Sequence, residues 1–221
     1  MIRVAVLAVF VLAALPVHAS ARPGYESSVR PLPAELRAEL SDRGFWRPGC
    51  PVSLSRLRLL TVTHWGFDDR PHTGQLVVNG SYAARLQGAF RQLYELRWPI
   101  RHMELSDMYG PASGRPKDND ISGSFHCRQS VPSPCTGGTR SGHWSNHAYG
   151  LAIDLNPREN PYVGCGMSYD PTTKRFMDRS PLRRGMVTPA VVAAFRSIGW
   201  GWGGSWSGNT KDYMHFSYNG H

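Results

Sequence analysis

Apolar side chains recur at three- and four-residue spacing between residues 81 and 97, which predicts a helix there. Ser81 can serve as its N-cap, and Trp98-Pro99 ends the pattern because proline cannot continue a helix. The apolar positions on the buried face are Leu86, Phe90, Leu93 and Tyr94. This is the strongest helical pattern in the chain.

Two further helices are predicted from the signals at their ends. The segment 188–198 has an expected N-cap at Thr188 followed by proline, and Gly199 comes directly after its end. A shorter helix is predicted over 33–43, which lies between a proline and a glycine.

Short runs rich in Leu, Val, Ile and Thr predict several strands. They are residues 50–67 with their apolar part at 57–64, then 75–78, 100–105, 150–155 and 215–218. Residues 106–124 form a long loop, and a loop of that length in a compact domain is more often functional than idle. This mixture of helices and short strands indicates the α+β class.

The N-terminus has the parts of a secretory signal peptide. Arg3 precedes an apolar run over 4–15, and Val17-His18-Ala19 fits a small-residue cleavage site. A run of about 12 residues is short for a bilayer span, so an uncleaved anchor is the weaker alternative. No later stretch is apolar enough to cross a membrane, so we expect an extracytoplasmic protein without stable membrane insertion. The predicted parts are a signal peptide over 1–19, a leader with a possible short helix over 20–45 and one domain over 46–221.

The chain is basic, with a formal net charge of +9. A basic secreted protein suits a polyanionic surface such as a cell wall. The basic residues are almost all arginine, and they are scattered rather than grouped in a stripe or recognition helix, so we do not predict a nucleic-acid partner. A plain bias of composition toward arginine explains the charge equally well.

The four cysteines form an even set in a chain with export signals, so disulfides are expected. Three pairings are possible, and we favour Cys127 with Cys135 and Cys50 with Cys165. A nucleophilic cysteine or a thiolate zinc site is the alternative, but no C-x-x-C spacing is present.

The most informative segment runs from Ser145 to Leu155. In a strand, Gly150, Ala152 and Asp154 would share one face, while Leu151, Ile153 and Leu155 would pack into the core. The first face then carries very small residues that lead to a carboxylate, which leaves room for a metal and a substrate. His147 precedes this strand, where the chain can turn its ring toward the same space.

A second segment, Asp212-Tyr-Met-His215, supplies another acid and another histidine. A tight turn between Asp212 and His215 would direct both side chains into one pocket. Two histidines and one aspartate make three protein ligands, and catalytic zinc typically has three with a fourth position for water. Asp212 is then free to act as general base.

The spacing S-x-H-x-x-G-x-A-x-D, followed far downstream by acid-x-x-H, resembles the VanY-like D-alanyl-D-alanine carboxypeptidases. These belong with the L-alanyl-D-glutamate endopeptidases in the LAS group of zinc peptidases. The resemblance covers about residues 50–218. Its further motifs are Gly66-Phe-Asp-Asp69, His72-x-Gly74, Trp98-Pro-Ile100, Ser124-Phe-His-Cys-Arg128, Asn156-Pro, Asn160-Pro-Tyr162 and Gly199-Trp-Gly-Trp-Gly-Gly204.

The resemblance implies a role for each matching residue. His147, Asp154 and His215 would bind one zinc ion. Asp212 would be the general base, Arg128 would hold the substrate's carbonyl or carboxylate, and Ser145 would form hydrogen bonds beside the site. It also implies a monomeric peptidase in which a small antiparallel sheet, flanked by helices, carries the metal. The expected partner is a peptidoglycan peptide.

Other functions remain as alternatives. A non-catalytic zinc-bearing module that binds the wall or a partner, as in the related Hedgehog signalling domain, would keep the metal ligands. A penicillin-sensitive serine peptidase needs S-x-x-K, and none of the three lysines has serine three residues before it. The choice between carboxypeptidase and endopeptidase depends on the loops over 106–144.

A few other polar and aromatic residues have alternative interpretations. His72 and His143 are the two remaining histidines for which a site role is considered. Asp68-Asp69 indicates a turn, with binding of calcium or of the substrate as the alternative. The group Trp200, Trp202 and Trp206 indicates packing, with carbohydrate stacking as the alternative.

Overall fold

The computed structural model describes residues 24–138 and 141–221, so the predicted signal peptide at 1–19 lies outside the described residues. Helices and small antiparallel sheets alternate along this part of the chain, which confirms the α+β class. No helix in the described ranges is long and apolar enough to cross a membrane.

The first sheet is antiparallel and has the order β1-β2-β3. Its strands are β1 (Ser27–Pro31), β2 (Leu57–Trp65) and β3 (Pro71–Asn79). The β2 strand confirms the apolar part of the predicted strand, although it begins at Leu57 and not at Cys50. The β1 strand was not predicted from the sequence, because its residues are mostly polar and it lies at the edge of the sheet. The boundary between leader and domain at residue 46 stays a prediction.

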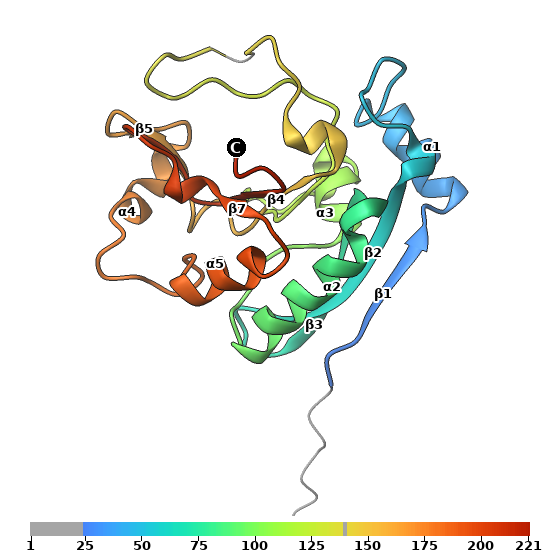
Figure 1. The fold of residues 1–221 in the computed structure, drawn as a ribbon, viewed down its shortest axis with the longest axis horizontal. Coiled ribbons are helices and arrows are strands. Elements are labelled where there is room, and N and C mark those ends of the chain that lie inside the picture. Colours follow the sequence, from blue (N-terminus) through green and yellow to red (C-terminus); the bar gives the residue numbers. More distant parts are fainter. Residues whose placement is uncertain (1–23, 139–140) are drawn as a thin grey trace, which may run out of the picture.

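Helix α2 (Gly80–Glu95) lies between this sheet and the C-terminal half of the chain (Figure 1). Its N-cap is Asn79 and not Ser81, as the sequence suggested. Asn79 Oδ1 accepts hydrogen bonds from the backbone N and the Oγ of Ser81, at 3.1 and 2.8 Å. Asn79 Nδ2 also donates to Tyr149 O at 2.9 Å, so the same side chain ties the helix start to the segment that carries His147.

The remaining helices are short. They are α1 (Ala34–Asp42), α3 (Leu105–Tyr109), α4 (Lys174–Met177) and α5 (Pro189–Arg196). The helices predicted over 33–43 and 188–198 are confirmed as α1 and α5. Thr188 caps α5 as expected, because its side chain accepts from Val191 N.

Two small antiparallel sheets make up the C-terminal half. The sheet β4-β9-β7 consists of β4 (Ala152–Asp154), β9 (His215–Ser217) and β7 (Gly201–Trp202). The sheet β6-β5-β8 consists of β6 (Met167–Ser168), β5 (Tyr162–Gly164) and β8 (Thr210–Asp212). The small antiparallel sheet expected to carry the site is present as β4-β9-β7, and the turn between β8 and β9 connects it to the second sheet.

The strand predicted over 100–105 is wrong. This segment forms only isolated bridges, one from Pro99 to Trp65 and one from His102 to Ile121, and α3 begins at its end. Its buried apolar positions, Ile100 and Met103, are three residues apart, which does not fit the two-residue period of a strand.

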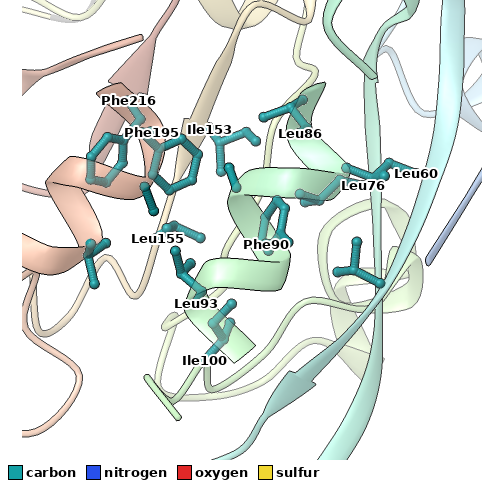
Figure 2. Close-up of a cluster of buried hydrophobic side chains, with 14 of the residues drawn as sticks. Leu60, Leu76, Leu86, Phe90, Leu93, Ile100, Ile153, Leu155, Phe195 and Phe216 are labelled. Carbon is teal, nitrogen blue, oxygen red and sulfur yellow. The ribbon is translucent and has the colours of Figure 1, made fainter. Parts of the chain in front are cut away.

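One hydrophobic core joins the halves of the molecule. Figure 2 shows Leu86, Phe90 and Leu93 of α2 reaching toward Ile153 and Leu155 beside β4. On the other side of these residues, the rings of Phe195 and Phe216 stack at 4.2 Å. Because Ile153 and Phe216 point into the core, the neighbouring residues of β4 and β9 point away from it.

The favoured cysteine pairing is wrong. The disulfides join Cys50 to Cys127 and Cys135 to Cys165. Cys127 is buried beside the start of the domain, where its N donates to Phe45 O at 2.9 Å, so it lies next to Cys50. Cys135 lies in a loop that extends away toward Cys165, and the short spacing to Cys127 does not bring those two together.

The capping role of Asn79 leads to a stability prediction. Asn79→Ala removes the N-cap and the bond to Tyr149, so we expect the free energy of unfolding to fall by about 1–2 kcal/mol. Ser81→Ala, at an exposed position that only donates to Asn79, should cost less than about 0.5 kcal/mol. Urea denaturation of both variants measures the difference, and equal losses would contradict the assignment of the cap.

Candidate metal centre

Strand pairing brings two of the three predicted ligands together, Asp154 and His215. Asp154 and His215 are direct partners in the antiparallel register of β4 and β9. Their neighbours Ile153 and Phe216 are fully buried in the core, so both site side chains extend from the opposite face of this sheet. The convergence of two residues 61 positions apart is thus a consequence of the β-sheet register.

His147 reaches the same place from a single 3₁₀ turn, Asn146–Tyr149. Ser145 is the N-cap of this turn, and its Oγ accepts from His147 N at 3.3 Å. The turn ends at Gly150, which adopts a left-handed φ of 66°. Ser145 therefore has a clear local role, which is to fix the backbone that carries His147.

The interpretation of the small residues before Asp154 needs correction. A Cβ on Gly150 would lie 2.8 Å from Asn79 N, so this glycine allows close contact with the start of α2. Ala152 is fully buried, and neither residue lines the cavity. Leu151, expected in the core, is only half-buried. The small side chains thus serve backbone packing behind the site and do not create space for a substrate.

The three predicted ligands form one tight cluster, as expected. His147 Nε2 lies 3.1 Å from one Asp154 oxygen, and His215 Nδ1 lies 3.0 Å from the other. The two ring nitrogens are 3.2 Å apart. Among the described residues, this is the group of histidine and acidic side chains whose geometry could hold a metal ion.

The outer nitrogen of each imidazole has a backbone partner. His147 Nδ1 lies 2.6 Å from Ser124 O, and His215 Nε2 lies 3.2 Å from His221 O. A carbonyl oxygen only accepts, so each outer nitrogen must carry the proton. In the neutral rings, the inner nitrogens then present lone pairs to one another and to the Asp154 carboxylate.

Three acceptors so close together repel unless a cation lies between them. Ligands about 2.1 Å from a tetrahedral zinc ion are roughly 3.4 Å apart, close to the separations seen here. An added proton on one ring is the other way to relieve the repulsion. Burial opposes a charge on Asp154, but the two histidines hold the pKa of this carboxyl well below its usual range. The donor set and its spacing therefore fit a divalent metal ion.

Asp212 lies beside the cluster at the end of β8, and two residues separate it from β9. The expected tight turn is present at Tyr213 and Met214, and both Asp212 and His215 line the same cavity. Gly203 packs directly on Asp212, since a Cβ at Gly203 would lie 2.5 Å from Asp212 O.

The Asp212 carboxyl is chemically unusual. Its Oδ1 is buried and has no hydrogen-bond partner in the structure. Burial and the nearby Asp154 carboxylate raise its pKa to about 7. A carboxyl with these properties can exchange a proton near neutral pH, which is what a general base requires.

Arg128 lines the same cavity, which has a volume of about 690 Å³. Its charge acts to lower the pKa of His147 and of Asp212, so the guanidinium is near both groups. Within the described part of the chain it has no acidic partner, and its side chain donates a hydrogen bond only to Gln129 O. The geometry leaves this cation free for a ligand.

Several residues of the cavity were missed from the sequence. The backbone oxygens of Ser124 and His221 form hydrogen bonds with the two imidazoles, and a sequence pattern of side chains cannot predict such a role. Arg158 and Tyr162 follow the motif by only a few residues and also line the cavity. Their position between the motif and the next strand could have indicated this.

The other candidates lie elsewhere. His72, near the start of β3, bonds at 2.9 Å to Asp68 in the turn between β2 and β3, and neither His72 nor His143 lines the cavity. Trp200 is buried in the core, as the packing interpretation expected. Trp206 differs from it, because it lines the cavity and its ring lies 6.0 Å from that of His215.

Fold and site together define an α+β protein with a buried His-Asp-His group that could hold a metal ion. Residues 139–218 match the family model of the D-alanyl-D-alanine carboxypeptidases. The match contains all three proposed ligands, Asp212 and Ser145, while Arg128 lies outside it. It confirms the resemblance to the VanY-like family. No curated protein and no solved structure matches the chain.

The contact between Gly150 and the start of α2 gives a stability prediction. Gly150→Ala places a Cβ against Asn79 N in a left-handed conformation, so we expect a loss of about 2–3 kcal/mol in the free energy of unfolding. Gly88→Ala is the matched control, because Gly88 is exposed in α2 with nothing within 4 Å of its added Cβ. The control should gain about 0.5–1 kcal/mol. Denaturant titration compares the two, and a neutral Gly150→Ala would refute the contact.

Proposed function

We propose that the chain is a secreted zinc peptidase that hydrolyses peptidoglycan stem peptides, as a D-alanyl-D-alanine carboxypeptidase or an L-alanyl-D-glutamate type endopeptidase. The observation that carries the proposal is the convergence of His147, Asp154 and His215, with three acceptor groups within 3.2 Å of one another. The match to a carboxypeptidase family supports a peptide substrate.

His147 Nε2, the Asp154 carboxylate and His215 Nδ1 would hold the ion. When bound there, zinc supplies a Lewis acid and makes a water molecule acidic near neutral pH. Asp212 takes the proton of the attacking water and passes it to the amine that leaves. Arg128 donates hydrogen bonds to the substrate's carbonyl oxygen as negative charge develops on it, and Ser145 holds His147 in place.

The buried, unpartnered Oδ1 of Asp212 favours catalysis over binding alone. Leaving a buried polar atom without a partner costs about 1–3 kcal/mol, and a module that only binds a partner gains nothing from this cost. A base that must exchange protons needs such an uncommitted oxygen. The non-catalytic zinc module is therefore the second candidate, and the experiment below separates the two.

The two disulfides are typical of proteins from oxidising compartments. They support export through a signal peptide over residues 1–19 and activity outside the cytoplasm, in the medium or at the cell wall. We propose one catalytic domain over 46–221 that acts as a monomer.

Two substitutions separate metal binding from catalysis. His215→Ala removes a ligand, so we expect zinc content to fall from about one equivalent to near zero. Asp212→Asn keeps the shape of the side chain but cannot take a proton, so zinc should stay bound while kcat falls about 10²- to 10⁴-fold. Zinc is measured by elemental analysis, and products of a defined stem peptide by mass spectrometry with and without a chelator.

The control for both variants is the wild-type protein reloaded with zinc after chelation, which should recover full cleavage. If the zinc-loaded wild type cleaves no stem peptide although Asp212→Asn also keeps its zinc, the binding module is the correct function. Full activity in Asp212→Asn would instead remove Asp212 from the mechanism.

A further inference from the structure

Arg158 is a second arginine in the wall of the cavity that contains the metal ligands. It follows β4 by four residues and is half-buried. Its Nε is buried and has no hydrogen-bond partner among the residues that the structure describes. Within the described ranges its guanidinium forms no ion pair and no contact with an aromatic ring, although buried polar atoms in proteins are nearly always bonded.

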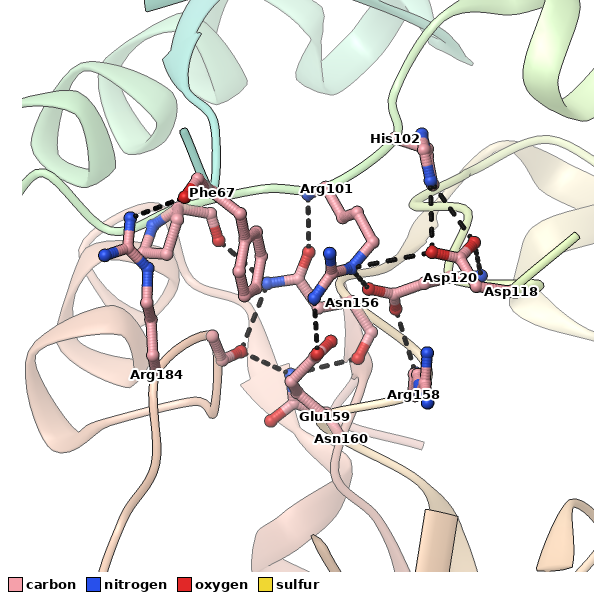
Figure 3. A network of polar contacts seen from close by, with 12 residues as sticks. Phe67, Arg101, His102, Asp118, Asp120, Asn156, Arg158, Glu159, Asn160 and Arg184 are labelled. Carbon is pink, nitrogen blue, oxygen red and sulfur yellow. Dashed lines mark hydrogen bonds and ion pairs between the residues drawn. The ribbon is translucent and has the colours of Figure 1, made fainter. Parts of the chain in front are cut away.

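Two acids adjoin Arg158, its chain neighbour Glu159 and the Asp120 carboxylate that its backbone N contacts, and both are already engaged by another arginine. Asp120 Oδ2 accepts from Arg101 Nε at 2.7 Å, and Glu159 Oε1 accepts from Arg101 Nη2 at 3.0 Å. Figure 3 shows this network, in which the Asp120 carboxylate accepts a hydrogen bond from the backbone N of Arg158 and not from its guanidinium. That bond, from Arg158 N to Asp120 Oδ1 at 2.9 Å, fixes the main chain and leaves the guanidinium uncompensated.

The backbone around Arg158 is held firmly. Asn156 N donates to Ser122 Oγ, and Asn156 Nδ2 donates to Pro99 O and Gly185 O. Asn160 follows with further bonds to Leu155 O and Val187 N. The guanidinium therefore extends from a rigid base, which lowers the entropy cost of binding a ligand.

The planar guanidinium group binds carboxylates with two parallel hydrogen bonds. We propose that Arg158 binds a carboxylate of the substrate that is separate from the carbonyl under attack. This inference rests on the proposed peptidase function and adds a second anionic subsite to it. The carboxylate has two sources, the free C-terminus of a peptide that is being trimmed or an acidic group inside the stem peptide.

Four soluble stem peptides distinguish these sources. They combine a C-terminal acid or amide with an internal glutamate α-carboxylate or its amide. On the peptide with both carboxylates, Arg158→Gln should raise KM about 10- to 100-fold with little change in kcat, since a charge-assisted hydrogen bond is lost. Arg158→Lys should recover part of the loss. Arg37→Gln, which removes an exposed charge in α1, is the matched control and should leave both constants unchanged.

The amides identify the group that is bound. If the effect of Arg158→Gln disappears with the C-terminal amide, Arg158 binds the free C-terminus and the enzyme is a carboxypeptidase. If it disappears with the internal amide, the subsite reads an acid within the stem peptide. An Arg158→Gln variant with unchanged constants, or one that is equally impaired on all four peptides, overturns the inference.

Calorimetric binding of the same peptides to the metal-free protein gives a readout that does not depend on catalysis. Arg158→Gln should weaken binding of the carboxylate peptide by the same factor and leave binding of the corresponding amide unchanged. If the zinc-loaded wild type cleaves no peptide, the proposed function fails, while this measurement still decides whether Arg158 binds a carboxylate. Equal affinities of wild type and variant overturn the inference, whatever the activity.

Discussion

The antiparallel pairing of Asp154 with His215 is the constraint on which the site depends. The pairing places a carboxylate beside an imidazole, and the core behind it prevents either strand from turning over. His147 then completes a set of three acceptors, each held from behind by a backbone oxygen or by the strand itself. Because these acceptors repel one another, a cation bound between them would stabilise the centre.

The charge of the surrounding cavity suits an anionic substrate. Arg128 near the metal ligands and Arg158 further along the wall are both without an acidic partner in the described part of the chain. With a divalent ion bound, the cavity would carry a positive potential, which attracts a peptide that has several carboxylates. The Cys135–Cys165 disulfide ties the loop that carries Ser130 and Val131 to the turn between β5 and β6, two strands that also contribute residues to the cavity. One part of the cavity wall is thus cross-linked by a disulfide, and another part carries positive charge.

The sequence predicted the class of fold and the three side chains that cluster at the candidate metal centre, because both leave local patterns. The helix over 81–97 has a clear apolar period. Two of the proposed ligands lie within a motif of fixed spacing, and the third ends a short acid-x-x-H motif downstream. The predicted strand at 100–105 failed because an apolar run alone does not show whether a segment pairs along its length. The disulfide pairing failed because it depends on which distant segments pack together, as Cys50 and Cys127 do. The carbonyl partners of the histidines could not be predicted, since every residue has a backbone oxygen.

Gly150 shows that a sequence motif can identify a position without revealing why that residue is needed there. The sequence correctly marked this position as one that needs a very small side chain, but the reason was different. The glycine is needed for contact between two backbones, and only the folded chain shows that the start of α2 lies there. A motif can therefore identify a position reliably while its physical cause comes from elsewhere in the fold.

X-ray absorption at the zinc edge of the purified, metal-loaded protein tests the central claim most directly. The account predicts two imidazole nitrogens and one or two oxygens at about 2.0–2.1 Å, and no sulfur at 2.3 Å. A spectrum with sulfur neighbours, or with oxygen neighbours and no imidazole, would contradict the proposal that His147, Asp154 and His215 share one ion.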